Sequence, residues 1–204
     1  MTQTLIDPRM FDTSQALGAH DASSLTNVPA GMSLVNHTSI TSSTADIQWT
    51  SLSEQMHVIY VWNLQPVNNN VDFRFHASTD NGSTYIAGTS YARVSNQITS
   101  SVGGEHNSGS NGTSPVQLHG NTNMSNGAGG SLVRIEFCRD AQNSTEASGM
   151  FQAQIRHGSD IATTTVGSFQ VYSLSGNDID AIKLDFSSGN IATAEASLFS
   201  VATA

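Results

Sequence analysis

The chain has 204 residues and a formal net charge of -9, with 7 Lys and Arg against 16 Asp and Glu. Only 11% of the residues are charged, whereas 30 Ser, 20 Thr and 16 Asn make up about a third of the chain. This composition argues against helical bundles and coiled coils, which are rich in Ala, Glu, Lys and Leu. The acidic balance argues against nucleic acid as a partner, because a basic face is missing. The length suits one all-β domain.

Residues 1–31 differ from the rest of the chain. Isolated apolar residues stand there among turn-forming residues, without a sustained period of 2 or 3.6. This pattern predicts an extended N-terminal arm with at most one short helix, at residues 12–17. The segment lacks the basic start and apolar stretch of a secretory signal, and the longest apolar run, residues 58–62, is too short to cross a bilayer. We therefore expect synthesis in a cytoplasm and no association with a membrane.

From Met32 onward, apolar and polar residues alternate in segments that are separated by Gly, Asn, Asp and Ser. A period of two is typical of half-buried strands. The predicted strands are residues 32–40, 45–50, 56–63, 71–78, 84–94, 131–138, 150–157, 161–173, 179–187 and 191–201. Nine or ten strands with no convincing interior helix predict an all-β domain over residues 32–204, a jelly-roll-like antiparallel β-sandwich.

Turn-forming residues support the predicted strands. Asp80-Asn81-Gly82-Ser83 and Ser188-Gly189-Asn190 contain residues that tolerate positive φ, which indicates hairpins. Residues 103–130 are rich in Gly, Asn and Ser, with residues 116–119 as their only strand-like piece, and this predicts a long loop. We expect the arm and this loop to make contacts between subunits.

Seven histidines are scattered along the chain, and none stands at a spacing typical of a zinc site. His57 and His76 lie on predicted strands and could share a metal ion only if those strands were neighbours. The single cysteine, Cys138, lies in an apolar run and is expected to be buried. We expect no metal site and no cofactor.

Several carboxylates alternate with apolar residues on predicted strands and could serve acid–base catalysis. They are Asp72, Glu136, Asp180 and Asp185. Because their side chains face away from the predicted core, solvated charges are expected rather than a hydrolytic pair, whose members must lie about 5–10 Å apart. The sequence also contains no nucleophile elbow and no phosphate-binding glycine loop. We expect no catalytic residues.

Exposed aromatic rings could form a platform on which sugar rings stack. Trp49 and Trp62 are expected in the core. Tyr85 and Tyr91 flank a predicted turn and are expected to be exposed. Together with His119 they are the candidate residues for contact with a glycan or a protein partner.

Each of two stretches of the chain consists of a predicted strand, a Gly-containing turn and a second predicted strand. Residues 73–85 read Phe-Arg-Phe-His-Ala-Ser-Thr-Asp-Asn-Gly-Ser-Thr-Tyr, and residues 179–192 read Ile-Asp-Ala-Ile-Lys-Leu-Asp-Phe-Ser-Ser-Gly-Asn-Ile-Ala, followed by Ala-Ser-Leu-Phe at residues 196–199. The first resembles a hairpin, and the second the C-terminal ending, of small virion structural proteins of tailed bacteriophages. Phe199-Ser200-Val201 departs from the aromatic-Gly-aliphatic ending that is more usual in that group.

The resemblance implies a virion protein that is not an enzyme and is assembled in the host cytoplasm. Its implied role is capsid decoration: a cement protein, expected as a homotrimer, that stabilises or covers the phage head by contacts between subunits. The implied partners are the major capsid protein or other virion proteins. The alternative is a lectin-like, receptor-binding tail-fibre module that recognises host surface glycans. An enzyme that acts on surface polysaccharide is the third hypothesis.

Overall fold

The computed structural model describes residues 31–99, 105–113, 115–119, 124–127, 130–139, 146–157, 161–172, 174 and 177–201. Residues 1–30, and with them the predicted short helix, lie outside this description. The strands of the described residues are β1 Met32–Ile40, β2 Asp46–Trp49, β3 Met56–Pro66, β4 Phe73–Ser78, β5 Tyr91–Thr99, β6 Glu105–Thr113, β7 Val116–Gln117, β8 Ser131–Cys138, β9 Ala147–His157, β10 Ile161–Val171, β11 Ala181–Phe186 and β12 Ile191–Val201. Over these ranges no helix is long and apolar enough to cross a membrane.

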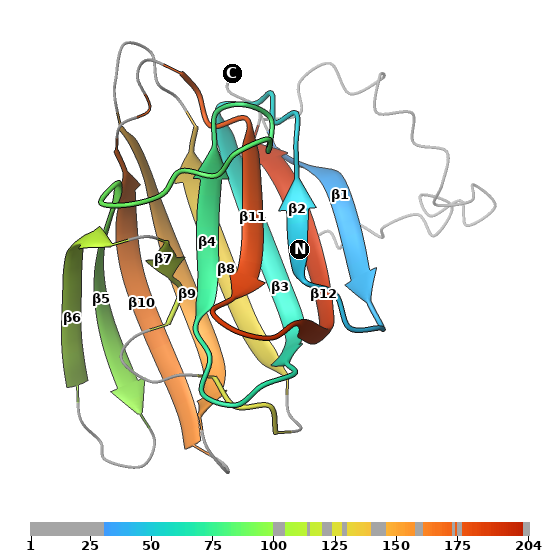
Figure 1. Cartoon of the computed structure of the whole chain (residues 1–204), viewed down its shortest axis with the longest axis vertical. Helices are drawn as coiled ribbons and strands as arrows, with labels where there is room; N and C mark the ends of the chain where they lie inside the picture. The colour runs from blue at the N-terminus through green and yellow to red at the C-terminus, as the bar shows by residue number, and fades with distance from the viewer. Residues whose placement is uncertain are drawn as a thin grey trace, which may run out of the picture.

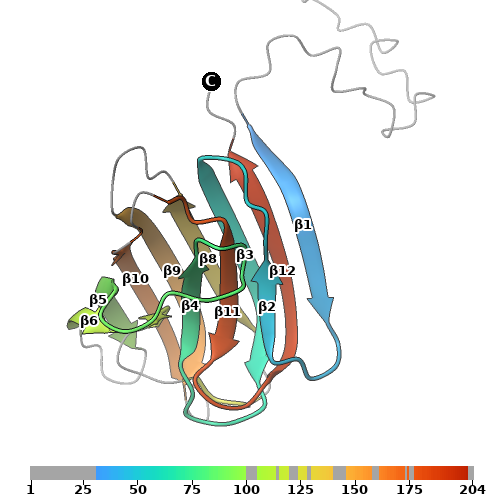
Figure 2. The same cartoon turned by 45° about the horizontal axis from the view of Figure 1, so that its top comes forward.

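The strands form two antiparallel sheets that face each other (Figure 1). The large sheet has the order β1-β12-β3-β8-β9-β10-β5-β6, and the small sheet has the order β2-β11-β4-β7. The small sheet lies over the middle of the large sheet, whose two edges are β1 and β6 (Figure 2).

The strand pairing is that of a jelly roll. β1 pairs with β12, β2 with β11, β3 with β8 and β4 with β7, and successive pairs alternate between the two sheets. A long antiparallel ribbon rolled into two sheets gives this nested order. The predicted all-β jelly-roll sandwich is therefore confirmed. The four other strands, β5, β6, β9 and β10, widen the large sheet beyond β8.

The core lies between the two sheets and is built by alternation along each strand. Phe75 of the small sheet is fully buried. Its ring centroid lies 5.5 Å from that of Phe137 and 5.0 Å from that of Phe169, which come from β8 and β10 of the large sheet. These aromatic contacts join the two layers at the centre of the sandwich.

Two glycines of the large sheet lie directly opposite aromatic residues on the neighbouring strand. Phe169 is paired with Gly149, and Phe151 is paired with Gly167. A Cβ atom at Gly149 would overlap the ring of Phe169 and lie 2.7 Å from the carbonyl oxygen of Glu136. Glycine is therefore required at these positions because the aromatic rings occupy the space over the backbone.

The turns at residues 80–83 and 188–190 form, but the prediction that they are hairpins is wrong. Asn81, Gly82 and Gly189 have the predicted positive φ. The second turn connects β11 of the small sheet to β12 of the large sheet. After the first turn, residues 84–90 form no strand, and Gly88 has φ +77, so the predicted strand at residues 84–94 is replaced by β5, which begins at Tyr91.

The prediction of one long loop at residues 103–130 is wrong in part. Glu105–Thr113 form β6, which pairs with β5 at the edge of the large sheet, and Val116–Gln117 form β7. β6 contains no large apolar residue. It can still form, because an edge strand can be held by backbone hydrogen bonds to its one neighbour. Its sequence therefore carried no alternation that could predict it.

The prediction that Cys138 is buried is also wrong. Val133, Ile135 and Phe137 of β8 point into the core, so the next residue points outward, and Cys138 is exposed. Trp49 is buried, as predicted. Trp62 is not part of the core: it shares the outward face of β3 with Tyr60 and stacks on His37, with ring centroids 5.7 Å apart.

Candidate functional site

A group of charged side chains lies on the outward face of the small sheet, where β4 and β11 pair. Asp185 lies at its centre: its Oδ1 accepts a hydrogen bond from Arg74 Nε at 2.8 Å and lies 2.9 Å from His76 Nε2. Lys183 Nζ lies 3.5 Å from Asp185 Oδ2. The register places Arg74 opposite Asp185 and His76 opposite Lys183. We call these four residues the Asp185 cluster.

The carboxylate of Asp185 is held in its ionised form. Burial alone would raise its pKa, but hydrogen bonds from His76 and Arg74, together with their charges, lower the pKa below the ordinary value of 3.8. All three basic side chains thus contact one carboxylate, and Arg74 also donates to the carbonyl oxygen of Phe186. Such a network suits the joining of β4 to β11 better than general-base catalysis, which needs a carboxylate that can take up a proton.

Tyr85, one of the predicted contact residues, adjoins the Asp185 cluster. Lys183 Nζ lies 4.7 Å from the centroid of its ring, and the His76 ring meets it edge-on at 6.1 Å. Its hydroxyl donates a hydrogen bond to Gln48 Oε1 at 3.2 Å. Partial burial and the charges of nearby carboxylates raise its pKa. Tyr85 therefore lies at the surface, but Lys183 covers one face of its ring.

The expectation that Tyr91 is exposed is wrong. Tyr91 is fully buried, because β5 begins at this residue and its side chain points between the sheets. Its hydroxyl accepts a hydrogen bond from the Ala77 amide and donates one to the Ile86 carbonyl oxygen. Burial raises its pKa to about 12. The side chain links β5 of the large sheet to β4 of the small sheet.

His119, the third predicted contact residue, is also buried. Its Nε2 lies 3.3 Å from Asp72 Oδ1, and this contact with His119 lowers the pKa of Asp72 despite partial burial. Gln117 Nε2 donates to the other carboxylate oxygen of Asp72. Arg93 donates to the carbonyl oxygens of Gln117 and His119. These bonds hold residues 117–119 against β5. His119 is thus buried there, whereas Tyr85 lies at the surface beside Lys183, and the structure does not bring the two together.

The structure separates the two histidines that could have shared a metal ion. His57 points into the core from β3 and stacks on Phe137 at 5.3 Å, whereas His76 belongs to the Asp185 cluster on the outward face of the other sheet. Among the described residues, no group of three or more His, Cys, Asp or Glu could hold a metal ion.

The buried His57 makes the stability of the fold sensitive to pH. Burial, aided by the charge of Arg139, lowers its pKa from 6.5 to about 4. The fold therefore favours the neutral ring, and its contribution is complete above pH 6.5 and is lost as the pH falls toward 4. With allowance for screening by solvent, we expect the free energy of unfolding to fall by about 2 kcal/mol between pH 7 and pH 4.5.

Urea denaturation at the two pH values measures this loss. In the control variant His57→Phe a ring remains against Phe137 but cannot titrate, so the loss between pH 7 and pH 4.5 should be clearly smaller. Equal losses in both proteins would contradict this assignment.

Sequence reasoning missed the Asp185 cluster as a group. Arg74 and His76 are two residues apart on one strand, as are Lys183 and Asp185 on another, so each pair could be assigned to one face of its strand. The sequence does not show that β4 pairs with β11. This pairing places Arg74 and His76 beside Lys183 and Asp185.

No protein-family model matches the chain, and no curated protein matches it. One solved structure that it resembles is a GH43 glycoside hydrolase, engineered in its active site, that displays both endo-xylanase and exo-arabinofuranosidase activity. The similarity covers 86% of this chain and 36% of that chain, so this chain spans about a third of that protein. The sequence identity is 9% and the TM-score is 0.28.

Proposed function

We propose that the chain is a structural protein of a tailed-bacteriophage particle, which decorates the capsid and cements it through contacts with its own copies and with the shell. The observation that carries this proposal is the exposed apolar and neutral polar side chains on one surface of the large sheet. This surface is the outward side of β5, β8, β9 and β10, and we call it the outer face. Jelly-roll sandwiches form many viral capsid and lectin domains, and this fold-level analogy supports the same class of function.

The outer face combines exposed apolar side chains with neutral polar ones. Val166 is 56% exposed, Ile98 52% and Leu132 45%. In the register, Leu132, Gln154, Thr164 and Ile98 form one row across the four strands. Exposed apolar residues gathered on one face are typical of interaction surfaces.

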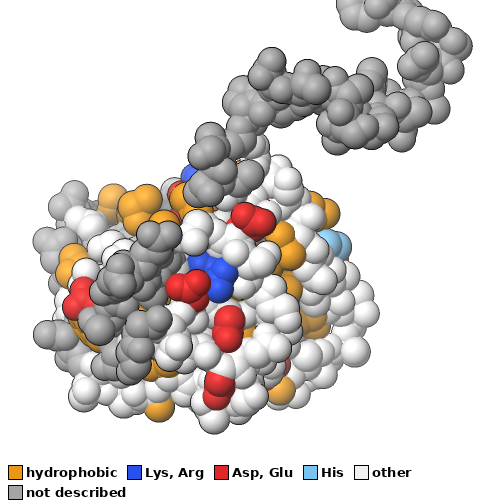
Figure 3. Space-filling model, turned by 90° about the horizontal axis from the view of Figure 1, so that it is seen from above, with side chains coloured by type: hydrophobic (Ala, Val, Ile, Leu, Met, Phe, Trp, Pro, Cys, Tyr) orange, Lys and Arg blue, Asp and Glu red, His pale blue; other side chains and the backbone are white. Residues whose placement is uncertain are grey.

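Charge on the outer face is low for an acidic chain. Arg134 and Glu136 neutralise each other at 2.6 Å. Much of the described surface seen from above is likewise neither charged nor hydrophobic, with separate acidic side chains (Figure 3). Because the whole chain carries a charge of -9, copies repel one another unless they meet through neutral surfaces such as the outer face.

Glycan binding by a tail-fibre module is the alternative proposal. It is favoured by aromatic side chains on outward faces, Tyr60 and Trp62 on the large sheet and Tyr85 on the small sheet. However, His37 stacks on Trp62 and Lys183 lies over Tyr85, so these rings offer less free area for stacking on a sugar. Capsid decoration therefore has the stronger support.

The copy number of the chain in purified particles tests the proposal. We expect quantitative mass spectrometry to find a copy number in a fixed, high ratio to the major capsid protein, and antibody labelling to lie over the head. A few copies per particle with labelling at the tail would contradict capsid decoration and favour the glycan-binding alternative. Absence from particles would contradict both proposals.

A matched pair of substitutions tests the role of the outer face. Val166→Asp places a charge at the centre of the outer face, whereas Val67→Asp places the same charge at another exposed valine, 44% exposed and outside it. We expect only Val166→Asp to lower the number of copies bound per particle, with both variants folded by circular dichroism. Equal binding of the two variants would show that the contact lies elsewhere.

A further inference from the structure

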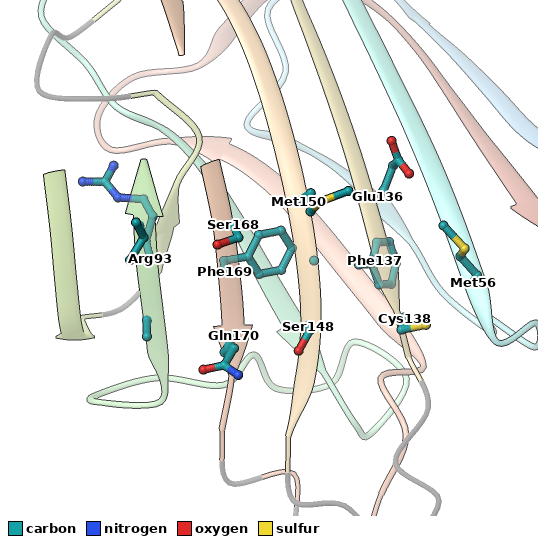
Figure 4. A pocket seen from close by; sticks show the side chains of 13 residues that line it. Met56, Arg93, Glu136, Phe137, Cys138, Ser148, Met150, Ser168, Phe169 and Gln170 are labelled. Atoms are coloured by element: carbon teal, nitrogen blue, oxygen red, sulfur yellow. The ribbon is translucent and has the colours of Figure 1, made fainter. Parts of the chain in front are cut away.

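The outer face combines protruding apolar side chains with a hollow at one end. Five of the nine large apolar side chains that are exposed among the described residues lie on this face: Val94, Ile98, Leu132, Met150 and Val166. A groove of about 440 Å³ opens where β8 ends and β5 begins (Figure 4). Its lining includes the short side chains of Ala92, Ser148 and Ser168. The face therefore offers both apolar side chains that leave the surface and a space that can receive such side chains.

The register orders the outward side chains of β8, β9, β10 and β5 into four rows across the face. The first row is Leu132, Gln154, Thr164 and Ile98, and the second is Arg134, Gln152, Val166 and Asn96. The third row is Glu136, Met150, Ser168 and Val94, and the fourth, at the groove, is Ser148, Gln170 and Ala92, with Cys138 at the end of β8. The exposed apolar side chains thus stand in the first three rows and the hollow lies at the fourth.

These rows are complementary to the same rows in reversed order. If a second copy faces the first, with each strand running opposite to its equivalent, the first row meets the fourth and the second meets the third. Ile98 then lies over Ala92 of the partner subunit. Val166 likewise lies over Ser168 of the partner subunit. Large apolar side chains thus meet short ones on both copies, as an isologous contact requires, and sheets packed face to face interdigitate in this way.

The charges of the outer face match in the same arrangement. Arg134 stands in the second row and Glu136 in the third, both on β8, and their side chains are 45% and 21% exposed. Reversal of the rows brings Arg134 opposite Glu136 of the partner subunit, and Glu136 opposite Arg134 of the partner subunit. Like charges would meet only if the rows kept their order. Charge complementarity therefore selects a two-fold axis that runs across the strands, between the second and third rows.

The area of the face is sufficient for a stable dimer. The four strands are 8 to 11 residues long. From the spacing and rise of strands, the face measures roughly 19 Å by 33 Å, or about 600 Å² of flat area. Because side chains project from the sheet, the accessible area is larger than the flat area and approaches the roughly 800 Å² per partner of a standard interface.

We propose that the outer face binds the outer face of a second copy of this chain about this two-fold axis. The inference rests on the proposed function for the role of the outer face as an interaction surface, and it deepens that proposal by naming the partner of the face. The chain is then a dimer before it meets a particle.

Charge reversal tests the predicted contact between Arg134 and Glu136. Arg134→Glu and Glu136→Arg each place like charges opposite one another in a dimer of that variant. We expect sedimentation equilibrium to show a dissociation constant about tenfold or more above that of the unmodified chain for each variant, with both folded by circular dichroism. In an equimolar mixture the new glutamate of one variant faces the new arginine of the other, so native mass spectrometry should find heterodimers.

Glu54→Arg is the matched control for Glu136→Arg. It makes the same change of charge at an exposed residue between β2 and β3, outside the outer face. The dimer should be unchanged in this variant. Equal weakening by Glu54→Arg would mean that net charge, and not the facing of Arg134 and Glu136, controls association.

Cys138, the single cysteine of the chain, reports the orientation of the two copies. Within one chain Leu132 lies roughly 20 Å from it along β8, but in the dimer it faces Cys138 of the partner subunit. A short bis-maleimide should therefore link Leu132→Cys chains into covalent dimers. The unmodified chain should form no such dimer, because its two cysteines lie at opposite ends of the contact.

Several outcomes would overturn the inference. They are a monomer of the unmodified chain at high concentration, a mixture of the two charge variants without heterodimers, and cross-linking of unmodified chains. A trimer, which the phage resemblance implies, would overturn it too, since an isologous contact closes with two copies. A monomer in solution that still occupies particles at high copy number would contradict this inference alone. A dimer that is absent from particles would contradict the proposed function alone.

Discussion

Replacing Gly149 by alanine is expected to lower the free energy of unfolding by about 3 kcal/mol, because the added methyl group has no space. Its Cβ atom would lie 2.7 Å from the Glu136 carbonyl oxygen and overlap the ring of Phe169. The carbonyl belongs to the paired strand β8 and cannot move without disturbing the sheet, so the substitution must shift both a backbone and a core side chain. Urea denaturation, monitored by tryptophan fluorescence, measures the loss.

Gly109→Ala is the matched control, since Gly109 is also a strand glycine of the large sheet. A Cβ atom there would have its nearest neighbour, the Arg93 carbonyl oxygen, at 3.8 Å, which is ordinary contact. We expect this variant to change the free energy of unfolding by less than about 0.5 kcal/mol. A similar loss in the two variants would mean that backbone freedom, and not space beneath Phe169, makes glycine necessary at position 149.

Phe75→Ala is expected to lower the free energy of unfolding by about 4 kcal/mol. The side chain is fully buried and is the contact through which β4 meets Phe137 and Phe169 of the opposite sheet. Its removal leaves a cavity between the layers, and the surrounding strands are fixed by their ladders and cannot close it. Thermal and urea denaturation should both record the loss.

Two further variants separate cavity formation from loss of a large side chain in general. Phe75→Leu fills much of the space and should lose less stability than Phe75→Ala. Val166→Ala removes apolar atoms from a position that is 56% exposed, and it should change stability by less than about 0.5 kcal/mol. A loss in Val166→Ala as large as that in Phe75→Ala would contradict the assignment of the core to the space between the sheets.

The parts of the fold that sequence alone predicted well are those in which apolar residues alternate. β8 and β12 have the predicted bounds, because alternate side chains of Val133 to Phe137 and of Ala194 to Leu198 enter the core. The jelly-roll class followed from the number of strands and the lack of helices. By contrast, β6 is held to β5 without large apolar side chains, and its residues therefore gave no periodic signal.

The errors at single residues have one physical cause: residue type does not determine which face of a strand a side chain takes. Cys138 and Trp62 belong to apolar runs, but each follows a residue that enters the core, so both point outward. Tyr91 was expected at the surface because it follows a predicted turn, but it takes the inward face of β5 and is buried. The candidate site depended on strand pairing as well, since neither Asp185 nor His76 shows from sequence which strand lies beside its own.

The pairing of the first strand with the last constrains when the protein can finish folding during its synthesis. His37 Nδ1 on β1 hydrogen-bonds to the hydroxyl of Ser197 on β12, 160 residues further along the chain. At 5–20 residues per second, roughly 8–32 s separate the synthesis of His37 from that of Ser197. Until then β1 has no partner strand and the large sheet has an open edge at β3. Contacts so distant in sequence also slow refolding. At high concentration, incompletely folded copies can therefore pair through their open strand edges before β12 covers them.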